Sequence, residues 1–185
     1  MNNESLEDAC KKLVSVLNPE WETNPDMKET PLRIAKMYAS FFRNEDTTQY
    51  FSKRFPTKNK ELVILKNIEC FGMCPHHLTP VIYNVHIGYI PRGWAIGLSK
   101  LARIAIALCS YPKLQENFTS EVANVINDNL KPRGVIVVVE GIHNCIRCRG
   151  VEKLSTCITS EIRGVFINHP ETKQEFISLI SLNNY

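Results

Sequence analysis

The spacing of apolar residues predicts an α-helical start to the chain. From Leu6 to Leu17 apolar side chains recur at intervals of three and four residues, which places them on one face of a helix. A second helix is predicted to begin at Thr30-Pro31, because threonine caps helices well and proline fits the first helical position. Later apolar stripes predict three more helices, over residues 101–108, 114–130 and 172–180.

Runs with the character of β-strands lie between and after those helices. Residues 61–69 hold a short apolar run, and residues 80–90 alternate loosely with β-branched and aromatic side chains. Residues 135–139 are five β-branched residues in succession, the pattern of a strand buried on both faces. Residues 155–166 suggest a further strand. The resulting order ααββααββα has no βαβ alternation, so it predicts an α+β fold with an antiparallel sheet.

The same pattern divides the chain into two parts. Residues 1–60 are expected to form an N-terminal helical extension with a basic loop, and residues 61–185 one compact domain. With 185 residues and 44% hydrophobic content, the chain can bury one sizeable core. Residues 44–60 are polar and basic, which favours a mobile surface loop over the alternative of a phosphate-attracting patch.

Composition narrows the functional classes. A net charge of +3 is too small to indicate a nucleic-acid partner, and no run of eighteen apolar residues suggests a membrane span. The first residues lack the basic start and apolar stretch of a signal peptide, so a cytoplasmic protein is expected. Seven cysteines, odd in number and unevenly clustered, favour metal binding or burial over disulfides. Cys109 and Cys157 lie in apolar or β-branched runs and are expected to be buried.

Two clusters carry the side chains that zinc prefers. Cys74-Pro75-His76-His77 is followed about 70 residues later by His143-Asn144-Cys145, with Cys148 close behind. If Cys148 joins the ligands, the spacing is that of a closed structural site. With three ligands one position stays open for water, and the other histidines become candidates for proton transfer. The spacing alone leaves both alternatives open.

Three further features are ambiguous by themselves. Continued extended structure after residue 139 would put His143, Cys145 and Arg149 on one face of a strand. Lys100 and Arg103 at the start of a helix could bind an anion, although such residues are more often simply solvated. Glu116 in the first turn of the next helix needs no role beyond stabilising that helix end.

Several longer segments together resemble the GTP cyclohydrolase I family. They are Glu29-Thr-Pro-Leu-Arg-Ile-Ala-Lys36, Cys74-Pro-His-His-Leu-Thr-Pro80, His86-Ile-Gly-Tyr-Ile-Pro91, Gly97-Leu-Ser-Lys-Leu-Ala-Arg103, Leu114-Gln-Glu116 and His143-Asn-Cys-Ile-Arg-Cys-Arg-Gly150. They occur in the family's order with matching gaps from about residue 30 onward, so the resemblance does not depend on any one short motif.

The resemblance implies a tunnelling fold, in which an antiparallel sheet carries helices on one face and subunits form a decamer with active sites at their interfaces. It also implies a Zn²⁺ cofactor and GTP as substrate. The implied metal ligands are Cys74, His77 and Cys145, and the implied proton-transfer residues are His76 and His143. The implied substrate-binding residues are Ser99, Lys100, Arg103 and Arg149 for the triphosphate, with Gln115 and Glu116 for the guanine.

The activity implied is hydrolysis and rearrangement of GTP to 7,8-dihydroneopterin triphosphate and formate, the first step of folate, pterin or deazapurine synthesis. Two alternatives stay open: an enzyme of the same fold acting on a related purine or pterin, and a binding module with a closed structural zinc. Two positions depart from the family pattern. Pro75 stands where glutamate is usual, and Gly72 where serine is usual.

Overall fold

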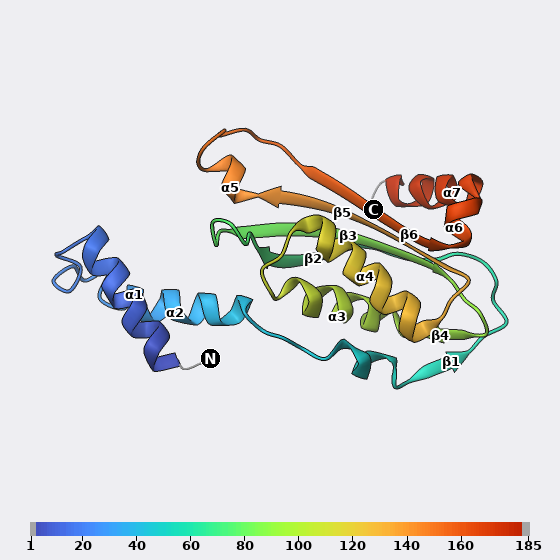
Figure 1. Ribbon diagram of the computed structural model, residues 1–185, viewed down its shortest axis with the longest axis horizontal. Coiled ribbons are helices and arrows are strands. Elements are labelled where there is room, and N and C mark those ends of the chain that lie inside the picture. The colour runs from blue at the N-terminus through green and yellow to red at the C-terminus, as the bar shows by residue number, and fades with distance from the viewer. Residues whose placement is uncertain (1–2, 183–185) are drawn as a thin grey trace. The chain divides into compact units, whose positions relative to one another are not determined.

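The structure is a computed structural model and describes residues 3–182. Contacts between residues divide the chain into two compact units that meet at the Arg43–Asn44 bond. The first unit is helical, and the second holds the β-sheet (Figure 1).

The first unit consists of α1 (Asn3–Leu17) and α2 (Thr30–Phe41). Both helices are where the apolar spacing predicts them, and Pro31 lies in the first turn of α2. Their small core includes Val14 and Trp21, and the Trp21 indole Nε1 donates a hydrogen bond to Ser15 Oγ at 2.9 Å.

Residues 44–60 belong to the second unit, which differs from the expected boundary near residue 60. Here the 3₁₀-helix η1 (Thr47–Phe51) buries Tyr50 and Phe51 in the main core. The short strand β1 (Arg54–Pro56) then pairs with β4 (Trp94–Ile96). The expectation of a mobile loop is wrong for these parts, because both have regular structure and the aromatic side chains of η1 supply core area that the polar composition conceals.

The main sheet has four antiparallel strands in the order β2-β3-β5-β6. Their bounds are Val63–Met73 for β2, Pro80–Ile90 for β3, Gly134–His143 for β5 and Cys157–Gly164 for β6. In the register of the sheet Met73 pairs with Pro80 and Val81 pairs with His143. The end of β2, the start of β3 and the end of β5 therefore meet at one end of the sheet.

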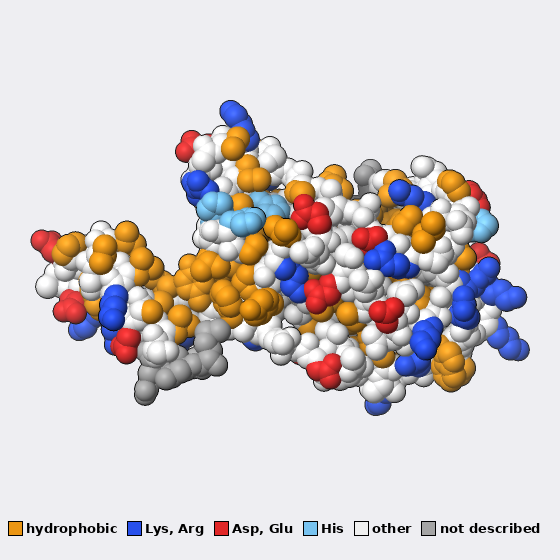
Figure 2. All heavy atoms as spheres, in the orientation of Figure 1, with side chains coloured by type: hydrophobic (Ala, Val, Ile, Leu, Met, Phe, Trp, Pro, Cys, Tyr) orange, Lys and Arg blue, Asp and Glu red, His pale blue; other side chains and the backbone are white. Residues whose placement is uncertain are grey.

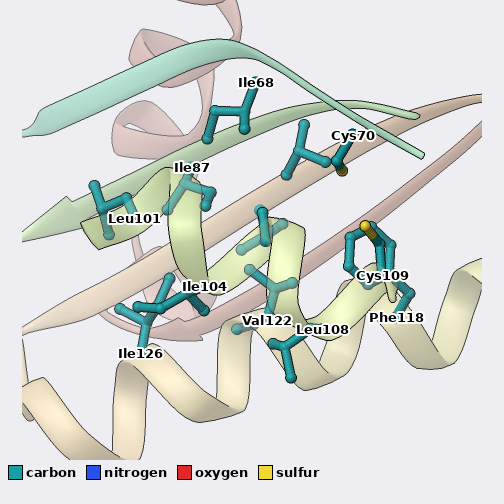
Figure 3. Packing of buried hydrophobic residues seen from close by; sticks show 14 of the residues in the cluster. Ile68, Cys70, Ile87, Leu101, Ile104, Leu108, Cys109, Phe118, Val122 and Ile126 are labelled. Atoms are coloured by element: carbon teal, nitrogen blue, oxygen red, sulfur yellow. The ribbon is translucent and has the colours of Figure 1, made fainter. Parts of the chain in front are cut away.

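Two helices, α3 (Leu98–Cys109) and α4 (Gln115–Leu130), cover one face of this sheet. Figure 3 shows Leu101, Ile104 and Leu108 of α3 packed between the strands and α4. Phe118, Val122 and Ile126 form the matching stripe of α4, and all three are fully buried. The apolar residues that recur along these two segments therefore lie on the side of each helix that contacts the sheet.

A smaller core lies on the other face of the sheet. There Phe166 of α6 (Val165–Asn168) and Phe176 of α7 (Pro170–Ser181) pack with Ile136 and Val138 of β5. The neighbouring valines of β5 point into the larger core. The strand is thus buried on both faces, as its β-branched run predicts.

These elements confirm the α+β class and the antiparallel sheet with its helical layer, the arrangement of the tunnelling fold. Helix α7 adds cover on the second face. Over the described residues 3–182, no helix combines the length and apolar character required to cross a bilayer.

Candidate active site

A cavity of about 440 Å³ opens where the ends of β2, β3 and β5 meet. The loop between β2 and β3, the start of α4, the end of β5, α5 (Asn144–Arg147) and the start of β6 form its walls. Of the residues predicted for the site, the cavity is lined by Cys74, His76, His77, Gln115, Glu116, His143, Cys145 and Arg149. The register of the sheet thus brings together two sequence clusters that are about 70 residues apart.

The loop from Cys74 to Thr79 is a tight turn held by its own backbone. Cys74 N donates to Thr79 O and Leu78 N donates to Cys74 O, both at 2.9 Å. Leu78 takes a left-handed conformation with φ of 49°, which is costly for a residue with a branched side chain. This closed turn fixes Cys74 in the buried floor of the cavity and leaves His76 and His77 exposed above it.

Cys74, His77 and Cys145 form a group that could hold a metal ion. One ligand atom from each lies within 4.8 Å of the others, and Cys74 Sγ is 3.7 Å from His77 Nδ1. Burial raises the pKa of the Cys145 thiol, and the adjacent Cys74 sulfur raises it further. Two neighbouring thiols, each of which makes ionisation of the other less favourable, lie beside an imidazole. Together they form a donor set suited to a thiophilic cation such as Zn²⁺.

Cys148 does not join this group. Its thiol is exposed and donates to Asn144 O at 2.8 Å, along the helix that it follows. The conditional expectation of a continued strand is wrong here, because β5 ends at His143 and the chain turns into α5. Asn144 Nδ2 donates to Pro80 O at 3.0 Å, which ties the start of that helix to β3.

His143 lies in the cavity wall with a defined partner. Its Nε2 is 2.8 Å from Gln115 Oε1, and its ring packs edge-on against Tyr83 with centroids 6.2 Å apart. Burial lowers the pKa of His143, and the nearby Glu116 carboxylate partly opposes that shift. The imidazole is therefore held mainly neutral near physiological pH, a state that can accept a proton.

The other cavity residues provide charge around the opening. The Glu116 carboxylate is exposed, and Arg149 Nη1 lies 2.5 Å from His77 Nε2. The rings of His76 and His77 meet edge to face at 6.2 Å. A row of histidine side chains is visible at this end of the second unit in Figure 2.

Ser99, Lys100 and Arg103 are not among the described residues that line this cavity. They lie in the first two turns of α3, where Lys100 Nζ is 5.4 Å from the centre of the Tyr50 ring. The C-terminal end of α3 is the end closer to the cavity, because Cys109 Sγ donates to the backbone oxygen of Phe71, near the end of β2, at 3.4 Å. Lys100 and Cys109 are nine positions apart along the helix, or about 14 Å.

Sequence reasoning missed some residues of the site. Cys157, expected to be buried, is exposed at the start of the edge strand β6 and lines the cavity. Thr159 Oγ1 accepts a hydrogen bond from the Gln115 carboxamide, and Gly141, which has no side chain, leaves room for that group. Their only signal in the sequence is a position in a strand, which does not reveal what lies across the sheet.

The sequence model of the family described as GTP cyclohydrolase I matches residues 6–181. Relatives named GTP cyclohydrolase 1 include one from Halalkalibacterium halodurans, 40% identical over 97% of both chains. One from Bacillus subtilis is 40% identical over 97% of this chain and 96% of its own. Among solved structures, the apo form of archaeosine synthase QueF-Like aligns with 56% of this chain and 96% of its own, at 19% identity and a TM-score of 0.46.

Proposed function

The chain belongs to the GTP cyclohydrolase I family, and from that premise we propose that it converts GTP to 7,8-dihydroneopterin triphosphate and formate with the aid of Zn²⁺. The observation that carries the proposal is the convergence of two distant clusters on one cavity. A thiol–imidazole–thiol group, two further histidines and a carboxylate all line it.

Cys74, His77 and Cys145 would hold the metal. Three protein ligands leave one coordination position open, as catalytic zinc sites require. When bound, zinc lowers the pKa of water to about 7 and so supplies hydroxide near neutral pH. The cavity is large enough to admit a purine beside these ligands.

Two histidines would move protons. Ring opening requires addition of water at C8 of guanine, a carbon of modest electrophilicity, and protonation at N7 makes it more reactive. A histidine suits that transfer, because its reference pKa of about 6.5 lets it give and take protons near neutrality. We assign this work to His143, in the cavity wall, and to His76, at the exposed rim.

Charged residues would hold the two ends of GTP. Glu116 at the cavity can accept hydrogen bonds from the ring N–H and amino groups of guanine. Arg149 at the same cavity, with Ser99, Lys100 and Arg103, would bind the triphosphate. The resemblance assigns Gln115 to guanine as well, but its carboxamide is already bonded within the protein.

The position of α3 favours a site shared between subunits. Lys100 lies about 14 Å along the helix from the end near the cavity side, so the phosphate-binding residues of one chain would serve the cavity of a neighbour. We propose a homo-oligomer built in this way, a decamer by resemblance to the family. Such an arrangement places each active site at a subunit interface.

The direct test is turnover of GTP by purified, zinc-loaded protein. Formate is assayed, and the pterin product is oxidised and detected by its fluorescence. Formate together with a neopterin species would support the proposal and mean that Pro75 is compatible with catalysis. Formate alone would indicate an enzyme that stalls after ring opening.

If neither product forms in folded protein with stoichiometric zinc, the assignment to GTP fails. Parallel assays with dGTP and dihydropterins then test the alternative of a related substrate. A binding module with a closed zinc site would instead require Cys148 and tolerate loss of His143. The position of the Cys148 thiol, bonded to Asn144 O, disfavours that alternative.

A further inference from the structure

The side chain of Gln115 has hydrogen-bond partners at both ends of its carboxamide, beside the cavity. Gln115 is the first residue of α4 and is only 3% exposed. Its Nε2 lies 3.0 Å from Val139 O, 3.1 Å from Cys157 O and 3.2 Å from Thr159 Oγ1. The carboxamide therefore bridges α4 to the two strands β5 and β6.

These partners fix which way the carboxamide faces. Backbone carbonyl oxygens only accept hydrogen bonds, so the NH₂ group must be the end that points at Val139 and Cys157. The oxygen Oε1 is then the end that points at His143 Nε2, 2.8 Å away. The ambiguity of amide orientation is removed by the network itself.

The fixed carboxamide in turn fixes the state of His143. An amide oxygen has no proton to give, so His143 Nε2 must carry the proton of this hydrogen bond. In the neutral ring the second nitrogen, Nδ1, then keeps its lone pair and becomes the atom that can accept a proton. The hydrogen bond persists whether Nδ1 is protonated or not.

The surrounding residues leave room for this pair and little else. A Cβ added at Gly141 would lie 2.1 Å from Gln115 Oε1 and 3.1 Å from His143 Nε2. On the other side the His143 ring packs against Tyr83, which is 2% exposed. Ring rotation is therefore limited by packing as well as by the hydrogen bond.

We propose that Gln115 is a positioning residue that holds His143 in its Nε2–H tautomer and presents Nδ1 for proton transfer. This proposal rests on the proposed function of His143. It gives the Gln115 side chain a different role from the guanine contact that the family resemblance implies. With both ends of the carboxamide satisfied inside the protein, guanine recognition at this helix start is left to Glu116 and to backbone groups.

A double-mutant cycle tests whether Gln115 acts through His143. Gln115→Met removes both hydrogen-bonding ends at similar volume. We expect kcat for GTP to fall about 10- to 100-fold while KM changes less than about threefold. In a His143→Ala background the same change should have almost no further effect on kcat, because the group it orients is gone.

Three results would overturn the proposal. A rise in KM as the main effect, or an equal loss in both backgrounds, would show that the Gln115 side chain contacts the substrate. A lower melting temperature with kcat unchanged would show a purely structural role. Gln174→Met, an exposed glutamine of α7, is the matched control and should change neither parameter.

A second measurement needs neither a variant at Gln115 nor turnover. Nitrogen-15 NMR of the full protein with labelled histidine distinguishes protonated from unprotonated ring nitrogens among the five histidines. The His143 signal is identified by its loss in His143→Gln. At about pH 8, where a histidine of ordinary pKa is neutral, Nε2 should be the protonated nitrogen, and a proton on Nδ1 would refute the proposal. If GTP is not turned over at all, the proposed function fails while this tautomer measurement still decides the inference.

Discussion

At the scale of single residues, the position of one sulfur favours an open over a closed arrangement of the candidate metal ligands. The ligand atom of Cys145 lies within 4.8 Å of those of the other two candidate ligands, whereas the Cys148 thiol donates a hydrogen bond to Asn144 O. We therefore expect Cys145→Ser to weaken zinc binding by more than about 100-fold, beyond what loss of an outer contact costs. Cys148→Ser should bind zinc as the wild type does.

The measurement is metal content after dialysis, combined with competition against a chelator of known affinity. Both variants replace the same thiol with the same hydroxyl, so each is the other's control. Loss of zinc in Cys148→Ser with full retention in Cys145→Ser would establish a different ligand set.

Gly72 gives a second prediction at this scale. A Cβ there would lie 2.5 Å from Tyr83 Cε2, closer than real contacts allow. Because Tyr83 is buried against Phe118, Gly72→Ala should destabilise the fold by about 1–3 kcal/mol. Urea denaturation measures the loss. If the clash with the ring is the cause, the cost should shrink in a Tyr83→Val background, and an unchanged cost there would contradict this explanation.

At the scale of elements, the position of His86 in β3 makes the stability of the fold depend on pH. The register of β2 against β3 is interrupted between Leu65 and Ile68, and in that interruption Asn67 N donates to His86 Nδ1 at 3.3 Å. Burial lowers the pKa of His86, with the Glu140 carboxylate raising it and Lys66 lowering it. The folded state therefore favours a neutral His86.

The sign of the pH effect follows from that lowered pKa. Below about pH 6.5 the unfolded chain binds a proton at this position more readily than the folded chain does, so stability falls with falling pH. Each tenfold change in proton affinity corresponds to about 1.4 kcal/mol. Urea denaturation at pH 7 and pH 5 should show a smaller loss for His86→Gln than for the wild type. An equal loss in both proteins would mean that His86 does not contribute.

At the scale of the whole molecule, the proposed sharing of each active site between two subunits predicts complementation between inactive variants. Lys100→Ala removes a proposed phosphate-binding residue from α3, and His143→Ala removes a proposed proton-transfer residue from the cavity. Each should be nearly inactive alone. In a one-to-one mixed oligomer about one quarter of the interfaces combine two intact halves, so activity should recover toward that fraction.

The subunits are mixed by unfolding and refolding, and co-assembly is verified with two affinity tags. A mixture of separately refolded variants, which shares no interfaces, is the control. Co-assembled oligomers that stay inactive would show that the α3 residues and the cavity of the same chain act together.

The sequence by itself determined the five longer helices, the doubly buried strand, the α+β class and the chemical identity of the candidate ligands. These follow from local periodicity and side-chain type, which the chain carries wherever it folds. The resemblance to a family came from the same linear information, because motif order and spacing are properties of the sequence. The β-branched run of residues 135–139 is the clearest case, since a strand with no polar face must be covered on both sides.

Only the tertiary structure decided which of these residues meet. The bond between Gln115 and His143 spans 28 residues, and the contact between His77 and Arg149 spans 72. Both depend on strand register, on where α4 begins and on the path of the chain after β5, which local patterns leave undetermined. For the same reason the sequence alone did not show that Cys148 lies outside the ligand group, that Cys157 lines the cavity or that Tyr50 is buried in the core. Contacts between distant residues are set by packing of the whole sheet, and no short window of sequence contains both partners.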